Sequence, residues 1–364
     1  MKVKYLIVLR EYVEKILQND RDEQMRVCFV ICWFGKLPDY LSIWLKTCKF
    51  NKRFYFLLIT DERINITLPN NVRYIVFTKE KFLMRIGERI IKNPSLDEPY
   101  RVCDFRPMYG IIFKEELVGY DFWGYCDIDL IFGDISTFIS KRDFNEKDAI
   151  FNGGHFTLLK NNEQMNNLYK CKGSLFRYKT VAKRDAIYAF DETTGIQNIA
   201  RVNNVNARFG IPYIDTESKY TQLRSRMECS NPNNQAFFWE KGHLYRVKEE
   251  NKTCYYQEIA YMHLQKRKLT ILDERVMSSE SFWVMPKGFK TKDYFGWPNK
   301  EDILKYNPDL GEKVRIKEEW DYKKAKFISI LKRNPFQIYV RFRQELVGIN
   351  AGDGVRKEME WTKY

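Results

Sequence analysis

The chain has 364 residues, of which 44% are hydrophobic and 30% charged, and its formal net charge is +14. This composition excludes global disorder, because a chain of this length and apolar content can bury a sizeable core. The basic balance suits nucleic acid, an anionic membrane or small phosphorylated molecules, but no zinc-finger or RNP signature accompanies it. We therefore expect no nucleic-acid partner. The length predicts two domains, or one large α/β unit with appendages.

The regular pattern begins after residues 1–25, which the sequence leaves unassigned. Segments of helical periodicity follow at Leu41–Cys48, with Asp39 as a candidate cap, and at Phe82–Ile90. Between and around them lie apolar runs of strand length: Val27–Trp33, Phe54–Thr60 and Val72–Phe77. Strands that are apolar throughout and alternate with helices indicate a largely parallel sheet with helices on both faces.

Ligands of such sheets bind beyond the carboxyl ends of the strands, so the residues that follow the first two strands are candidates for ligand contact. Phe34 could stack on a nucleotide base, with Gly35 beside it, and Asp61 could accept a hydrogen bond from the base. The alternative, that these are ordinary loop residues, explains the pattern equally well.

A second candidate segment is Cys103–Pro107. Pro107 suits the first position of a helix, and Arg106 beside it could contact a diphosphate or sugar hydroxyls. Asp104 could orient that arginine or the sugar. The alternative is a plain helix start that Asp104 caps and Pro107 stiffens.

The strongest motif follows the apolar strand Phe122–Cys126, where Asp127 and Asp129 are separated by one residue. Two carboxylates at a fraying strand end can both face a hard divalent cation such as Mg²⁺ or Mn²⁺, which keeps open positions for substrate phosphates. A solvated turn is the alternative. A haloacid-dehalogenase-type phosphatase also uses two such acids, but on the first strand of its domain and with Thr or Val where this chain has Ile131.

The second half of the chain is less regular, and we expect it to shape the site of a second substrate. A glycine pair, Gly153 and Gly154, precedes a short strand at Phe156–Leu159. Such a pair admits close backbone approach or forms a simple turn. A further strand is predicted at Tyr255–Leu264, and it carries His263.

Taken in order, these motifs resemble the GT-A nucleotide-sugar glycosyltransferases, and more narrowly a bacterial group from capsule and surface-polysaccharide clusters. The likeness covers about residues 26–270. The matching segments are Phe34–Gly35, Thr60–Asp61, Asp104–Pro107 with Tyr109–Gly110, Tyr125–Asp129, Phe151–His155, and His263 with Lys266.

The resemblance implies a Mn²⁺- or Mg²⁺-dependent enzyme that uses a UDP-sugar. It further implies that His263 completes the metal site, although a histidine packed on its strand is the alternative. Lys266 would contact the diphosphate, while Gly153, Gly154 and His155 would line the donor sugar and the acceptor.

Similar enzymes place acidic residues near the acceptor, and Asp191 and Glu192 are the candidates here. Either could deprotonate or orient the acceptor hydroxyl. The alternative is a helix cap with surface charge, and Asp215 is a weaker substitute.

The segment Lys323–Arg343 holds seven basic and no acidic residues, interleaved with apolar ones. Asn334 and Pro335 predict a cap and first position of a helix that ends near Gly348. A basic, partly apolar segment suits an anionic membrane surface, where a lipid-linked acceptor would reside. The alternative is a helix packed on the catalytic domain with solvated lysines.

The eight cysteines form no C-x-x-C pair, and with only three histidines a structural zinc site is not expected. No apolar stretch approaches the roughly 18 residues of a transmembrane helix, and Tyr5–Leu9 is too short for a secretory signal. We expect a cytoplasmic protein with reduced thiols, or one peripheral to the inner face of the cell membrane.

The sequence thus predicts a GT-A-like α/β catalytic domain at residues 26–285, with a nucleotide-binding half at 26–150 and an acceptor half at 151–285. A basic helical extension at 286–364 follows. The predicted reaction moves a hexose from a UDP-sugar to a hydroxyl of a growing bacterial surface polysaccharide. The rivals are the phosphatase, a glycoside hydrolase, whose paired carboxylates need no metal, and a non-enzymatic nucleic-acid- or membrane-binding protein.

Overall fold

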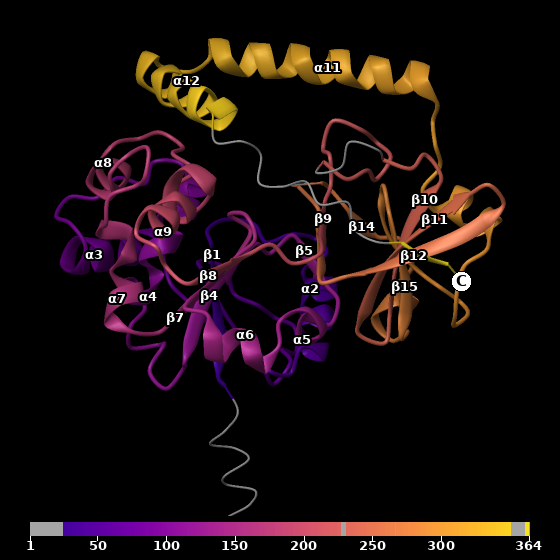
Figure 1. Cartoon of the computed structure of the whole chain (residues 1–364), viewed down its shortest axis with the longest axis horizontal. Coiled ribbons are helices and arrows are strands. Elements are labelled where there is room, and N and C mark those ends of the chain that lie inside the picture. The colour runs from indigo at the N-terminus through magenta and orange to yellow at the C-terminus, as the bar shows by residue number, and fades with distance from the viewer. Residues whose placement is uncertain (1–24, 227–230, 266, 351–360, 364) are drawn as a thin grey trace, which may run out of the picture.

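The computed structural model describes residues 25–226, 231–265, 267–350 and 361–363. An α/β lobe and a lobe of largely antiparallel strands lie side by side, and two helices run above both (Figure 1). The predicted α/β class is confirmed.

The α/β lobe is built on a seven-stranded sheet with the order β3-β2-β1-β4-β7-β6-β8. Its first four strands in space run parallel, whereas β7 is antiparallel to both neighbours, β4 and β6. The sheet is therefore largely but not wholly parallel. The strands are β1 Val27–Trp33, β2 Phe54–Thr60, β3 Val72–Val76, β4 Phe122–Cys126, β6 Ala149–Phe151, β7 Phe156–Lys160 and β8 Ala207–Phe209.

Helices cover this sheet, and two details of their starts differ from the sequence prediction. Tyr40 precedes the first helix, and Asp39 pairs with Lys36 instead of capping it. Pro99, and not Pro107, is the first residue of a 3-10 helix, a position that the fixed φ of a proline suits. Pro107 lies inside that helix. The helices are α2 Leu41–Phe50, α3 Lys79–Arg89, η1 Pro99–Met108, α4 Tyr109–Ile112, α5 Ile135–Phe138, α6 Lys141–Glu146, α7 Glu163–Asn166, η2 Leu168–Lys170, α8 Tyr178–Lys183, η3 Thr193–Gln197 and α9 Asn198–Val202.

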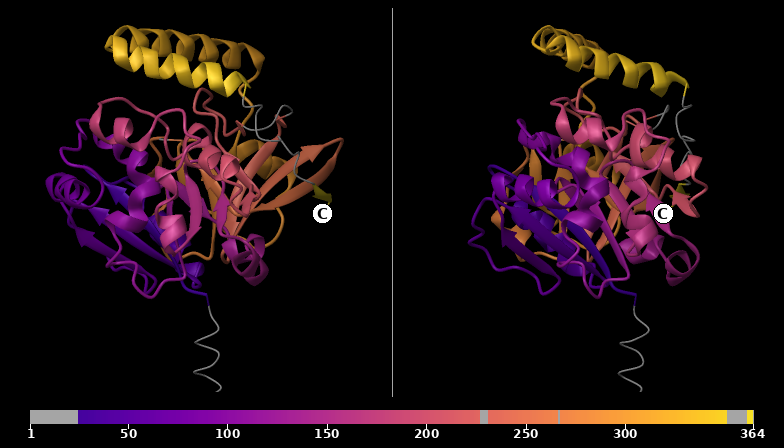
Figure 2. Two further views of the ribbon diagram at one scale, coloured as in Figure 1. Left: turned by 60° about the vertical axis from the view of Figure 1, so that its left-hand side comes forward. Right: turned by 90° about the vertical axis from the view of Figure 1, so that its left-hand side faces the viewer.

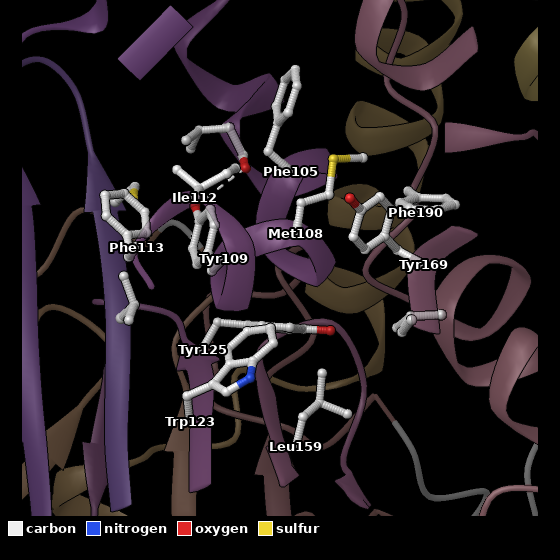
Figure 3. Close-up of a cluster of buried hydrophobic side chains, with 14 of the residues drawn as sticks. Phe105, Met108, Tyr109, Ile112, Phe113, Trp123, Tyr125, Leu159, Tyr169 and Phe190 are labelled. Carbon is white, nitrogen blue, oxygen red and sulfur yellow. Dashed lines mark hydrogen bonds between the residues drawn. The ribbon is translucent and has the colours of Figure 1, made fainter. Parts of the chain in front are cut away.

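A hydrophobic cluster on one face of the sheet holds β4 in place (Figure 3). Trp123 and Tyr125 point from β4 toward Tyr109 of α4, and all three side chains are fully buried. Between them, Gly124 lies so close to β7 that a Cβ there would sit 2.0 Å from the carbonyl oxygen of Thr157. This packing fixes the strand that Asp127 directly follows.

Two further sheets complete the described chain. The prediction of one strand at Tyr255–Leu264 is wrong. The strand is interrupted at Ala260, and the parts before and after it belong to different sheets. The three-stranded sheet consists of β5 Leu130–Phe132, β13 Tyr261–His263 and β9 Tyr213–Asp215. The antiparallel lobe contains β14 Thr270–Ile271, β16 Gly288–Thr291, β15 Ser281–Met285, β10 Gln235–Glu240, β11 His243–Glu250, β12 Thr253–Ile259 and β17 Thr362–Lys363, with η4 Glu274–Met277 and α10 Lys300–Tyr306.

Residues 312–331 and 335–350 are helical, and the helix that the sequence predicts to begin at Pro335 is confirmed. Helix α11 spans Glu312–Leu331, and α12 begins at Pro335 and continues to Asn350. The two helices lie together above the body of the molecule (Figure 2). No helix in the described part of the chain is long and apolar enough to cross a membrane.

Candidate functional site

The two acids of the sequence motif lie where β4 ends and β5 begins. Strand β5 pairs antiparallel with β13, and Leu130 lies opposite His263. The backbone N–H of Leu264 donates to the carbonyl oxygen of Asp129 at 2.9 Å. This register brings His263 beside both acids.

The three side chains converge on a common centre. The Nε2 atom of His263 lies 3.3 Å from Asp127 Oδ2 and 3.4 Å from Asp129 Oδ1. Two ligands at right angles on a cation with bonds of about 2.1 Å would be about 3 Å apart. Asp127, Asp129 and His263 could therefore hold one divalent cation with little rearrangement.

Asp215 contacts the other nitrogen of His263. Strand β9 runs parallel to β13 with Asp215 at the position matched to His263, and Oδ1 of Asp215 lies 2.9 Å from Nδ1. The amide of Gln265 donates to the same oxygen at 2.5 Å. Burial lowers the pKa of His263, but the carboxylates of Asp129, Asp127 and Asp215 outweigh it and hold that pKa well above its usual value.

His155 forms a second group with Asp215 and His263 whose ligand atoms also lie close enough to share a metal. Its ring centre is 4.6 Å from that of His263, and its Nδ1 atom lies 3.2 Å from the hydroxyl of Tyr261. Burial, aided by the positive charge of His263, lowers the pKa of His155 to about 4. His155 is therefore neutral near pH 7 and available as a ligand.

Arg106 lies in the same site, but its guanidinium contacts protein groups. It donates to the carbonyl oxygen of Gly154 at 2.8 Å and to Asp191 Oδ2 at 2.9 Å, and it also donates to Asp127 Oδ1. The arginine thus joins the candidate metal ligand to one candidate catalytic acid. Its predicted contact with a diphosphate stays a prediction.

Asp104 neither caps a helix nor pairs with Arg106. Its carboxylate accepts hydrogen bonds from the backbone N–H groups of Tyr188 and Phe190 at 3.1–3.2 Å. Burial raises the pKa of Asp104 to about 6, although these bonds and Arg101 oppose the rise. Asp104 therefore anchors the segment that leads to Asp191.

The glycine pair lies against the candidate catalytic acids. A Cβ on Gly154 would meet Cγ of Glu192 at 2.6 Å and Oδ2 of Asp191 at 3.0 Å, and Gly153 has a φ of +73°. Asp191 is buried, whereas Glu192 is exposed. Gly154 thus lies in a turn that approaches both acids closely, and the predicted contact of the pair with the donor sugar and acceptor stays a prediction.

The residues after the first two strands differ in position. Phe34 is buried, and its ring centre lies 5.5 Å from that of Phe82. Gly35 donates its backbone N–H to Asp61 Oδ1 at 2.8 Å, which ties the two loops together. Lys266 lies outside the described residues.

The candidate metal ligands and catalytic acids face a large cavity of about 1760 Å³. Among the described residues its lining includes Phe34 but neither Gly35 nor Asp61. It also includes the candidate metal ligands, the candidate catalytic acids and their neighbours: Asp127, Asp129, His155, Asp191, Glu192, Asp215 and His263.

Sequence reasoning missed the role of Asp215 as partner of His263, and it missed Gln265 and Tyr261. No spacing signal connects Asp215 with His263, since 48 residues separate them. Asp215 and His263 each end a short strand, β9 and β13, and the sequence predicts no strand at residues 213–215.

No curated protein matches this sequence. The family of unknown function DUF6625 matches residues 29–293, which include all the described site residues. The chain belongs to this family.

Proposed function

We propose that this protein is a metal-dependent glycosyltransferase that moves a hexose from a UDP-sugar to a hydroxyl of a growing bacterial surface polysaccharide. The observation that carries the proposal is the convergence of Asp127, Asp129 and His263 at the carboxyl end of β4. In open α/β sheets this is the edge at which nucleotide ligands bind. The resemblance of the ordered motifs to GT-A enzymes supplies the substrate class.

The donor set favours Mn²⁺ over Mg²⁺, because imidazole suits softer cations than a pair of carboxylates alone does. A cation bound there would neutralise the negative charge that develops on the leaving nucleoside diphosphate. Arg106 binds Oδ1 of Asp127 and leaves Oδ2 facing His263. The arginine thereby orients one ligand.

Glu192 is the better candidate for the acceptor hydroxyl. Asp191 is buried and hydrogen-bonded to Arg106, whereas Glu192 is exposed and lines the cavity. A carboxylate in this place would accept or orient the hydroxyl proton. Asp191 would act through Arg106.

The size of the cavity also supports two substrates. Sites for one small molecule are typically about 300–1,000 Å³, and this cavity reaches about 1760 Å³. A nucleotide sugar and the end of a glycan could occupy it together.

The test is isothermal titration of a UDP-sugar panel in Mn²⁺ and in EDTA, together with the release of free UDP. Asp127→Asn and Asp129→Asn should each abolish metal-dependent UDP release while the circular-dichroism spectrum stays that of the folded parent. Asp97→Asn is the matched control, because Asp97 is exposed and is not among the residues that line the cavity. Equal donor affinity in EDTA and Mn²⁺, with normal turnover by both variants, would overturn the proposal. Release of inorganic phosphate in place of UDP would indicate the phosphatase alternative.

A further inference from the structure

Helix α11 buries little of its surface along its whole length. None of its 20 residues is buried. Its apolar side chains are nevertheless large, and several are more than half exposed: Ile316 51%, Trp320 70%, Phe327 62% and Leu331 68%. Contiguous exposed apolar surface of this kind marks an interaction site.

These four side chains form one stripe. They recur at spacings of four, seven and four residues, which places them on one face of an α-helix. The opposite face contacts the body through Glu318, which accepts from the backbone N–H of Thr221 at 3.1 Å, while Glu319, at the flank of the stripe, accepts from the hydroxyl of Tyr220. Glu318 follows Ile316 by two residues, about 200° around the helix. The apolar stripe therefore faces away from the protein.

Helix α12 is arranged in the same way. Its inner face packs on the α/β lobe, since Val340 is buried there and Gln344 donates to the carbonyl oxygen of Ile187 at 3.2 Å. The opposite face carries exposed apolar side chains at four-residue spacing: Ile338 43%, Phe342 58% and Leu346 43%. Figure 2 shows the two helices side by side on one side of the molecule.

The charge around the outward stripe is mostly positive, and the exposed Glu312, four residues before Ile316, is an acidic exception. Lys313, Lys317 and Lys324 are exposed and lie three or four residues from a stripe residue. The acidic residues Glu318 and Glu319 are turned toward the body by their contacts with the 220–221 loop. An apolar stripe flanked by lysines is the pattern of a helix that lies in the interface of an anionic membrane.

We propose that the outward face of α11 and α12 docks on an anionic lipid bilayer. The apolar side chains enter the boundary between headgroups and acyl chains, and the lysines contact the lipid phosphates. The seven basic residues of the 323–343 segment, which contains no acid, favour this occupant over a second copy of a chain whose net charge is +14. The docking surface lies beyond residues 29–293, so it is additional to the family match.

The docked orientation places the cavity beside the bilayer. Ile187, which Gln344 contacts, lines the cavity, and so does Arg267, whose guanidinium donates to the carbonyl oxygens of Tyr220 and Thr221 under α11. Both helices thus rest on the cavity rim. The inference that the acceptor is lipid-linked rests on the proposed function. The proposed membrane docking does not rest on the proposed function.

The experiment is co-sedimentation of the full chain with phosphatidylcholine vesicles, with and without phosphatidylglycerol. We expect binding only when phosphatidylglycerol is present, and weaker binding as salt rises, since exposed charges are screened over about 8–10 Å. The double variant Lys317→Ser/Lys324→Ser should lose about twentyfold or more in affinity, at about fivefold per lysine. Trp320→Ser/Phe327→Ser should lose at least about tenfold.

The matched controls are exposed residues on the α/β lobe. Met84→Ser/Val118→Ser removes apolar side chains that are 60% and 77% exposed, and Lys52→Ser removes one exposed lysine. These variants should bind as the parent does. Because α11 has no buried residue, its variants should also melt as the parent does.

Three results would overturn the proposal. The first is the absence of binding by the parent, and the second is undiminished binding by both α11 variants. The third is a lipid-free dimer that Trp320→Ser/Phe327→Ser dissociates, which would make a second copy the occupant. Donor-dependent UDP release without vesicles, measured in parallel, separates failure of the docking from failure of the proposed reaction.

Discussion

His263 and Asp215 lie at matched positions of two parallel strands, with Nδ1 of the histidine 2.9 Å from Oδ1 of the acid. The opposite nitrogen, Nε2, faces Asp127 and Asp129. A carboxylate in this place fixes the ring orientation and determines which nitrogen can bind a metal. Asp215 is thus a positioning residue for the candidate metal site.

Asp215→Asn should weaken Mn²⁺ binding by about 10–100-fold. Without the carboxylate of Asp215, the imidazole of His263 is less basic and its ring orientation is less fixed. Isothermal titration with Mn²⁺ alone measures the change without any substrate. Asp97→Asn, an exposed acid, should bind Mn²⁺ as the parent does. If Asp215→Asn retains the affinity of the parent, His263 is held by packing alone or is not a ligand.

Arg106→Gln should lower the free energy of unfolding by about 3–5 kcal/mol, since it leaves the buried Asp191 without its counter-charge and Asp127 with His263 alone. Urea denaturation followed by circular dichroism measures the loss. Arg142→Gln is the control: its ion pair with Glu146 is at the surface, where removal costs about 1 kcal/mol or less. Equal small losses in both variants would show that the Arg106 network contributes little to stability.

Gly154→Ala should reduce sugar transfer by about 10²-fold, because its Cβ would displace Glu192 and Asp191 and misplace groups at the reacting centre. Gly87→Ala provides the contrast. Its Cβ would meet only Pro94, at an ordinary 3.8 Å, and alanine within helix α3 should stabilise the protein by about 0.5–1 kcal/mol. Steady-state transfer rates and thermal melting distinguish the two effects. Full activity in Gly154→Ala would exclude a catalytic role for the close contact of Gly154 with Asp191 and Glu192.

Cys28 and Cys32 should resist alkylation by iodoacetamide at pH 8 in the native protein. Burial raises the pKa of each thiol to about 12, so the reactive thiolate is scarce below that pH. Cys171 is exposed and should be labelled. Peptide mapping by mass spectrometry, with a denatured sample as the control, measures each site. Rapid native labelling of Cys28 would show that β1 is accessible to the reagent.

Much of the α/β lobe was predictable because its signals are local. The apolar runs of β1, β2 and β4 coincide with strands in the structure, and Asp127 follows β4 as expected. Helix starts were less certain: the structure places Pro99, and not Pro107, at the start of its helix. A proline pattern alone does not distinguish the first residue of a helix from an interior position in a 3-10 segment.

The sequence by itself determined where the paired acids lie, because an apolar strand that ends in two carboxylates is a short-range pattern. Only the tertiary structure decided which residues meet them. The registers of β5, β13 and β9 bring His263 and Asp215 to Asp129, and Arg106 crosses to Asp127 and Asp191. Strand register depends on packing between segments far apart in the chain, and a slip of one residue would turn His263 to the opposite face.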